Sequence, residues 1–379
     1  MKKIISILLV LLLMLSVAAC AAPADSSPAA SPSNAAETES APAETTAAAP
    51  SSEASASTEV ETHVVTDYLG REVELPVNLT KVCVNDSYNM ECINVLGALD
   101  SVVGVDWNIA NDTEAWGRVY DESYLIGSEG SEINYEAVIE KQPDVLITSE
   151  VYDYEEMIAQ LEPFGIPVVV CNAYDTTNFF ANMELFGEMF NKADRAQEIC
   201  DYFQSNLDYV NQQLEGVEKK RVYFEYRNPG RVTIPGDSFY NMVEYAHADN
   251  LFKNATSTEV DLEAVVEANP DYIVKVSEPQ VAWTYEPPTD EDFARIKDEL
   301  YSRAGWDEIS AVQNDQTLLL SGYVQGGAAK LVGTFYVAKF LYPDLLPDLH
   351  PEAIFAQWLE YQGKDYIAGH TRPAFGLED

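Results

Sequence analysis

From Thr62 onward, short runs of Val, Ile and Leu alternate with segments whose apolar residues recur at helical spacing. Alternation of strand-like and helix-like segments predicts a mostly parallel sheet covered by helices. The runs that we interpret as strands read KVCVN, SVVGV, DVLIT and IPVVVC in the first half, and RVYFEY, DYIVKV and TLLLS in the second. The alternation stops once and restarts, so we predict an α/β fold with two lobes.

One long segment separates the two groups of strands. Asn178 to about Leu214 contains no proline, and its apolar residues follow helical spacing. It predicts one helix, or a barely interrupted pair, up to about 50 Å long at about 1.5 Å per residue. We therefore expect an N-terminal lobe at residues 63–177, a connecting long helix at 178–216 and a C-terminal lobe at 217–379.

The start of the chain has a different pattern. Lys2 and Lys3 precede an uncharged apolar run, Ile4 to Val17, and then small residues that end at Cys20. Residues 1–20 resemble a bacterial lipoprotein signal peptide, in which the cysteine becomes the lipidated first residue of the mature protein. The apolar run is shorter than the roughly 20 residues that span a bilayer, so we favour a lipid anchor over a transmembrane helix.

Residues 21–62 consist almost wholly of Ala, Ser, Thr, Pro and Glu. This composition predicts a disordered tether, because it offers little apolar surface for burial. We expect an extracytoplasmic protein that is anchored to the outer face of the cytoplasmic membrane. It would touch the membrane through its lipid only.

The charge balance narrows the choice of partner. The chain has 63 acidic and 22 basic residues, and its net charge is −41 at pH 7. Phosphate binding needs clustered Lys and Arg, so this balance argues against a nucleic-acid partner. It favours docking to a basic surface.

Four cysteines follow Cys20, and they leave two alternatives open. They are buried free thiols or they include a disulfide, since both are compatible with a protein outside the cytoplasm. The chain has only four histidines, which are scattered, and no Cys-x-x-Cys pair, so we expect no metal site built from the protein's own residues. The four cysteines are Cys83, Cys92, Cys171 and Cys200.

One motif occurs twice, as INYEAVIEKQPDVLI at residues 133–147 and as VDLEAVVEANPDYIV at 260–274. Each copy predicts a short helix that begins after Asn134 or Asp261 and ends at Pro-Asp, before a buried strand. The repeat indicates two pseudo-symmetric lobes.

Each copy also places a glutamate at the second helical position, Glu136 in the first and Glu263 in the second. The helix dipole favours an anion there by roughly 0.3–1 kcal/mol, and this alone could explain one such residue. Two glutamates at the same register suggest that each lobe presents a carboxylate from an equivalent corner.

Beyond the tether, the chain resembles the solute-binding proteins of ABC importers for iron-siderophore complexes, haem and cobalamin. The resemblance covers nearly all of the remaining sequence and rests on seven segments in the expected order. They read VTDYLGREVELP, LGALDSVVGV, NYEAVIEKQPDVLI, GIPVVV, NPDYIV, WDEISAVQNDQTLLL and LYPDLLPDL.

The resemblance implies a non-enzymatic, monomeric binding protein with no catalytic residue and no cofactor of its own. Its ligand would be a metal chelate, an iron complex and first of all a ferric siderophore, with haem, cobalamin or a small oxyanion as alternatives. Its partners would be an ABC permease dimer and the attached ATPase subunits. In this family Glu136 and Glu263 would each pair with an arginine pocket on one permease subunit, a contact that mainly sets orientation and association rate.

The resemblance also implies a ligand cleft between the lobes, where the ends of parallel strands and their loops converge. Arg227 and Arg231 share one such loop and are candidate clamps for carboxylate or catecholate oxygens. The alternative for both is a surface salt bridge with one of the many acids. Aromatic residues recur in these loops and would contact a ligand with apolar faces and oxygen-rich edges: Tyr88, Trp107, Tyr152, Tyr174, Trp283 and Tyr323.

One local feature is similar to a hydrolase motif, and another departs from the family pattern. The tetrapeptide GDSF around Ser238 is similar to the nucleophile block of some hydrolases, which would make the chain a surface enzyme, but no Asp-x-x-His follows near His350. The family also has a Gly-Gly-x-Asn pattern where this chain reads HADN, so Asn250 is kept and the glycines are not. A surface enzyme or sensor on the same scaffold is the second hypothesis, because a fold does not fix function.

Overall fold

The computed structural model describes residues 61–128, 132–276, 285–325 and 330–376. All of them belong to one compact unit of the chain. The predicted signal peptide with Cys20, nearly all of the predicted tether, and Trp283 lie outside the described residues. Within the described ranges, no helix combines the length and the apolar character that crossing a membrane requires.

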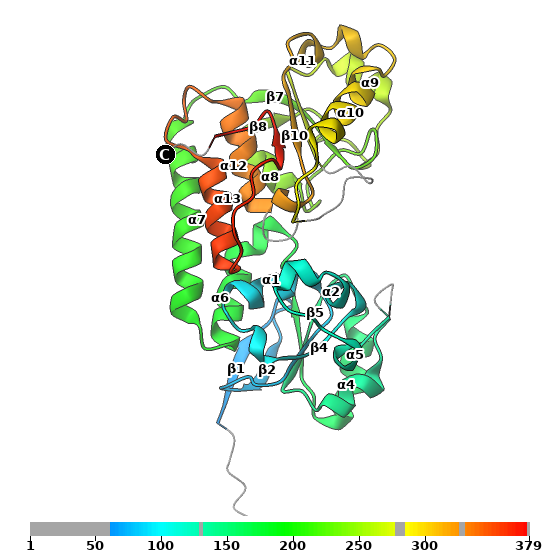
Figure 1. The fold of residues 1–379 in the computed structure, drawn as a ribbon, viewed down its shortest axis with the longest axis vertical. Coiled ribbons are helices and arrows are strands. Elements are labelled where there is room, and N and C mark those ends of the chain that lie inside the picture. Colours follow the sequence, from blue (N-terminus) through cyan, green and yellow to red (C-terminus); the bar gives the residue numbers. More distant parts are fainter. Residues whose placement is uncertain (1–60, 129–131, 277–284, 326–329, 377–379) are drawn as a thin grey trace, which may run out of the picture. The chain divides into compact units, whose positions relative to one another are not determined.

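The N-terminal lobe is built on a parallel sheet of four strands in the order β4-β3-β5-β6 (Figure 1). An antiparallel hairpin of β1 and β2 precedes it. Every residue of β5 and β6 is buried, which explains why these strands read as continuous apolar runs. The strands are β1 (Thr62–Thr66), β2 (Glu72–Pro76), β3 (Val82–Val84), β4 (Val102–Val105), β5 (Val145–Ser149) and β6 (Val168–Cys171). The helices of this lobe are α1 (Ser87–Val95), α2 (Trp107–Asn111), α3 (Thr113–Trp116), α4 (Tyr135–Lys141) and α5 (Tyr154–Leu161).

The C-terminal lobe contains five strands in the order β11-β10-β9-β7-β8. All neighbours are parallel except the edge strand β11, which pairs antiparallel with β10. The two mostly parallel sheets predicted from the sequence are thus confirmed. The strands are β7 (Lys220–Tyr226), β8 (Ala248–Asn250), β9 (Tyr272–Val276), β10 (Thr317–Leu320) and β11 (Thr371–Arg372). The helices are α8 (Tyr240–Tyr245), α9 (Leu262–Ala268), α10 (Asp290–Tyr301), α11 (Ser310–Gln313), α12 (Lys330–Leu341) and α13 (Pro351–Tyr361).

The segment between the sheets differs from the single long helix of about 50 Å that its spacing allows. It forms two helices, α6 (Phe179–Met189) and α7 (Ala193–Gln213), and the chain reverses between them at Asn191, which has a φ of 54°. A Cβ on Gly187 would lie 2.6 Å from the Cβ of Ala196, so the two helices approach closely at this glycine. The connecting helix is therefore α7 alone, about 30 Å long at about 1.5 Å per residue.

The C-terminal helices α12 and α13 pack against the antiparallel pair of helices α6 and α7. Phe203 of α7 lies 5.6 Å from the ring of Trp358 in α13 and 6.4 Å from that of Phe335 in α12, and Phe179 of α6 lies 6.2 Å from Trp358. One large cluster of buried apolar side chains runs through the inner faces of both sheets and these four helices. The lobes thus share a continuous core, and α7 is one of several elements that connect them.

The structure also separates the two alternatives for the cysteines. Cys83, Cys92, Cys171 and Cys200 are all buried and all free. Burial raises the pKa of Cys83 and of Cys200 to about 12, so both remain protonated at neutral pH. They act as small core side chains, which corresponds to the free-thiol alternative.

Candidate functional site

The two copies of the repeated motif form matching helix starts, as predicted. Helix α4 begins after Asn134, whose side chain accepts a hydrogen bond from the backbone N of Ala137 at 3.1 Å. Helix α9 begins after Asp261, whose side chain makes no capping bond. Glu136 and Glu263 are the second residue of their helices, and both side chains are exposed. Their geometry suits docking to a large partner, and the docking role itself stays a prediction.

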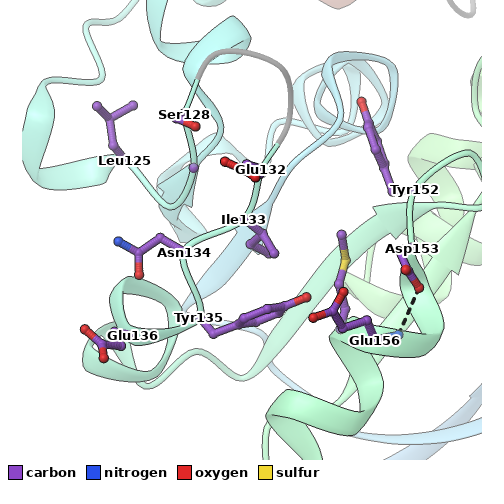
Figure 2. A pocket seen from close by; sticks show the side chains of 12 residues that line it. Leu125, Ser128, Glu132, Ile133, Asn134, Tyr135, Glu136, Tyr152, Asp153 and Glu156 are labelled. Carbon is purple, nitrogen blue, oxygen red and sulfur yellow. Dashed lines mark hydrogen bonds between the residues drawn. The ribbon is translucent and has the colours of Figure 1, made fainter. Parts of the chain in front are cut away.

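Glu136 also lines a hollow of about 730 Å³ in the N-terminal lobe, between the starts of α4 and α5. Figure 2 shows the ring of Tyr135 extending across this hollow toward Glu156, while Glu136 points to the other side. No basic residue is among the described residues that line it. The lining residues are Leu125, Gly127, Ser128, Glu132, Ile133, Asn134, Tyr135, Glu136, Tyr152, Asp153, Glu156 and Met157.

A second cavity, of about 450 Å³, is lined by residues of both lobes. Tyr88, Tyr152 and Tyr323, which the sequence placed in the cleft, all line it. The cavity also contains acidic residues and a lysine that the sequence reasoning missed. Its lining consists of Asp86, Ser87, Tyr88, Glu91, Asp106, Asn108, Asp112, Ala115, Trp116, Tyr152, Gly322, Tyr323, Trp358, Gln362 and Lys364.

Two of the predicted aromatic residues lie outside that lining. Trp107 is the first residue of α2, and 36% of it is exposed. Tyr174 lies next to the cavity wall, since its ring centroid is 6.4 Å from that of Tyr88, and its hydroxyl donates to Oε1 of Glu150 at 2.9 Å. Tyr174 therefore supports the wall through Tyr88.

The two arginines of the predicted cleft loop flank Tyr226 at the end of β7. The guanidinium carbons of Arg227 and Arg231 each lie 5.9 Å from the centre of the Tyr226 ring. Nη2 of Arg231 is 3.9 Å from a carboxylate oxygen of Asp237, which corresponds to the salt-bridge alternative. Neither arginine is among the residues that line the cavity, and their contact with a ligand stays a prediction.

Two buried carboxylates hold the helices that face the cavity. Asp86 caps α1 by accepting from the backbone N of Tyr88 at 3.0 Å and of Asn89 at 2.9 Å, and Asp106 caps α2 by accepting from Ile109 at 2.9 Å. Burial raises the pKa of Asp86 to about 6, and it raises the pKa of Asp106 as well. Asp106 directly follows β4, and Asp86 follows β3 after one residue, so both caps lie at the ends of parallel strands.

Lysines approach this region from the C-terminal lobe. Lys364 donates to the hydroxyl of Tyr323 at 2.7 Å, and burial lowers its pKa. Lys330, at the start of α12, is buried and donates to the backbone carbonyl of Tyr174. Its ammonium lies 5.3 Å from the ring centre of Tyr88 and 4.9 Å from that of Phe239, and burial lowers its pKa to about 8.

We expect the Lys330→Met variant to change how stability depends on pH. The pKa of Lys330 is 10.5 when unfolded and about 8 when folded, so the unfolded chain binds more protons between these values. Stability of the wild type should therefore rise with pH through this window, relative to the variant, by up to roughly 3 kcal/mol. Denaturant unfolding of both proteins at the two ends of the window measures this. An equal pH response in both would show that Lys330 titrates normally.

The GDSF tetrapeptide forms a turn before α8. Asp237 accepts from Oγ1 of Thr233 at 2.8 Å and from the backbone N of Phe239 at 2.9 Å, so its carboxylate holds the turn. Among the described residues, no hydrogen bond joins Ser238 to a histidine. The same part of the chain contains no group of three or more His, Cys, Asp or Glu side chains that could hold a metal ion.

Comparisons with known proteins agree with this architecture. The family model described as "Periplasmic binding protein" matches residues 82–323. The chain is 26% identical over 345 residues to the iron-uptake system-binding protein of Bacillus subtilis, which covers 87% of this chain and 95% of that protein. It is 25% identical over 321 residues to an uncharacterized lipoprotein of Methanocaldococcus jannaschii, covering 79% of this chain and 72% of the relative.

A solved structure shows the same fold. The TroA-like periplasmic binding protein FepB from Veillonella parvula superposes with a TM-score of 0.68 at 20% identity, over 83% of this chain and 99% of that one. The match extends over both lobes and α7, so the two-lobed arrangement with a connecting long helix is confirmed as a known fold.

Proposed function

This chain belongs to the periplasmic binding protein family, in the branch that serves ABC importers for iron complexes and cobalamin, and on this premise we propose that it captures a ferric siderophore. The observation that carries the proposal is the cavity of about 450 Å³ to which both lobes contribute aromatic walls. Tyrosine and tryptophan rings suit a chelate with apolar faces and polar edges. The iron-uptake name of the Bacillus subtilis relative supports iron as the metal.

Delivery would proceed by docking to an ABC permease dimer with its ATPase subunits. Glu136 and Glu263 start equivalent helices in the two lobes, so one carboxylate is available to each permease subunit. Charge pairs at the rim of an interface mainly set orientation and association rate, which suits a protein that must dock and leave repeatedly. The binding protein would act as a monomer, with one docking corner on each lobe.

Native mass spectrometry of the protein purified from its own host tests the ligand assignment. The expected result is an additional mass that contains iron and disappears when the metal is stripped at low pH. A haem or cobalamin mass would replace the siderophore with one of those ligands. A protein that turns over its ligand, instead of releasing it unchanged, would favour the surface enzyme.

We further propose that Cys20 carries a lipid that holds the protein at the membrane. The Cys20→Ala variant should then be released into the medium or periplasm, because the lipid would be the sole membrane contact, and its ligand affinity should not change. Cell fractionation followed by ligand titration measures both effects. A variant that stays with the membrane after a high-salt wash would contradict the lipid anchor.

A further inference from the structure

The described residues that line the cavity between the lobes carry more acids than bases, and the buried Lys330 lies next to this lining, 5.3 Å from the ring centre of Tyr88. Four acidic residues and one basic residue, Lys364, are among the described residues that line the cavity. The ammonium of Lys364 already donates to the hydroxyl of Tyr323, and it lies 5.6 Å from the ring centre of Tyr285 and 5.3 Å from that of Tyr323. The protein's own lysine is thus held by aromatic rings in the way that such rings hold cations. The acidic residues are Asp86, Glu91, Asp106 and Asp112.

Asp86 has an oxygen to offer a ligand. The residue is 5% exposed, and both of its backbone donors, Tyr88 and Asn89, bond to Oδ1. Among the residues that the structure describes, no donor reaches Oδ2. Because Asp86 lines the cavity, its carboxylate offers a negative charge with which a cationic ligand would pair.

The aromatic walls favour a positive charge on the ligand as well. The indole N–H of Trp116 donates to the carbonyl of Ile109 at 3.0 Å, and that of Trp358 donates to Glu91 at 3.2 Å. Their polar atoms are therefore committed within the protein, and what these residues offer a ligand is ring surface. Ring faces attract cations and also pack against apolar groups.

We propose that the ligand of this cavity carries a net positive charge, so that the protein selects cationic chelates and rejects the anionic ones. The inference rests on the proposed function and narrows its substrate class. A ferric complex of three hydroxamates is neutral, and an added ammonium group makes it positive. A ferric complex of three catecholates is strongly negative. The acids of the cavity would repel the second kind, and no arginine is among the described residues that line the cavity.

Three ferric probes test the charge preference on the full mature protein after removal of bound ligand. They are a linear trihydroxamate with a terminal ammonium group, the same compound with that amine acetylated, and a triscatecholate. Quenching of Trp116 and Trp358 fluorescence would report binding, since both residues line the cavity. We expect the cationic probe to bind about tenfold or more tightly than its acetylated form, which is about 1.4 kcal/mol, and the triscatecholate to bind weakest.

The Asp86→Asn variant tests whether Asp86 causes the preference for the positively charged probe. Asparagine is an equally good helix cap, so α1 should persist while the charge is lost. The cationic probe should lose about tenfold in affinity and the acetylated probe should change little. Asp112→Asn, another cap that lines the cavity, should reduce the preference in the same direction. Asp121→Asn, a cap that lines neither cavity, should leave both affinities unchanged.

The outcomes separate the inference from the function on which it rests. Tighter binding of the triscatecholate, or a preference that survives both Asp86→Asn and Asp112→Asn, would overturn the charge selection and leave the metal-chelate function standing. Failure of all three probes to bind would contradict both.

Discussion

Reversing Glu136 and Glu263 to lysine together is expected to abolish uptake while leaving ligand affinity intact. Both side chains are exposed on first helical turns, and neither lines the cavity between the lobes. Each lysine loses a favourable dipole contact worth roughly 0.3–1 kcal/mol, so the fold should survive. At the permease each reversal would place a lysine next to an arginine, and such a like-charge contact costs several kcal/mol. Uptake of the radiolabelled chelate by cells and titration of the purified variant measure the two effects.

Matched controls lie one turn further along the same helices. Glu140 and Glu267 are also exposed, and their reversal to lysine should impair uptake less. Charge reversal of the facing arginines in the permease should partly restore uptake by the double variant. If the Glu136 and Glu263 double variant transports normally, the carboxylates only stabilise helix starts. If it loses the ligand instead, they belong to binding.

The Glu225→Leu variant is expected to lose on the order of 3–5 kcal/mol of stability, because it removes the anion at the centre of a buried ionic cluster. Glu225 is fully buried and accepts from Arg303 at 2.8 and 3.0 Å, while Nζ of Lys275 lies 3.0 Å away. Burial alone would raise the pKa of Glu225, but the hydrogen bonds of Arg303 and the charge of Lys275 outweigh it and lower that pKa. The variant leaves the buried Lys275 and the partly buried Arg303 without this carboxylate.

The same cluster fixes the loop that follows β7. Glu225 also accepts from the backbone N of Gly230 at 2.9 Å, and Lys275 donates to the carbonyl of Arg227 at 2.5 Å. Denaturant unfolding of the Glu225→Leu variant measures the loss. Replacing Glu225, Lys275 and Arg303 together by apolar residues should recover most of it, since no buried charge then remains.

An exposed ion pair provides the control for this prediction. Nζ of Lys253 lies 2.6 Å from Asp249, with 42% and 34% of the two side chains exposed. Asp249→Asn should cost less than about 1 kcal/mol, because solvent screens such pairs. A loss of that small size for Glu225→Leu would mean that the buried cluster does not stabilise the fold.

Much of the fold could be predicted because its signals are local. Buried parallel strands must be apolar on both faces, so they stand out as runs, and the repeated motif marked equivalent helix starts at Asn134 and Asp261. The reversal at Asn191 carried no such signal. Asparagine is compatible with an uninterrupted helix and also tolerates positive φ, so this residue alone does not distinguish a helix from a reversal. The close approach of Gly187 to Ala196 in the folded chain favours the reversal. His247 likewise adopts a φ of 59°, at a position where the family resemblance led us to expect a glycine, and it makes a 2.8 Å contact to the Val217 carbonyl.

The candidate site was only partly predictable for a similar reason. Tyr88, Tyr152 and Tyr323 lie three or four residues after the ends of β3, β5 and β10, and strand ends are where a cleft of this fold is expected. Lys364 belongs to the segment after α13. Contacts between residues that are far apart in the sequence bring this segment to the cavity. Lys330 looks like an ordinary surface lysine in the sequence, and only tertiary packing shows that it is buried.

Uptake by a strain that lacks this chain tests whether the protein delivers an iron chelate to a permease. Cells with and without the gene are supplied with the iron chelate found on the native protein, carrying radiolabelled iron, and accumulation inside the cell is measured over time. We expect that deletion abolishes accumulation, that the wild-type chain restores it, and that the Glu136 and Glu263 double variant does not. Undiminished uptake in the deletion strain, by a chelate that the purified protein binds tightly, would contradict delivery to a permease.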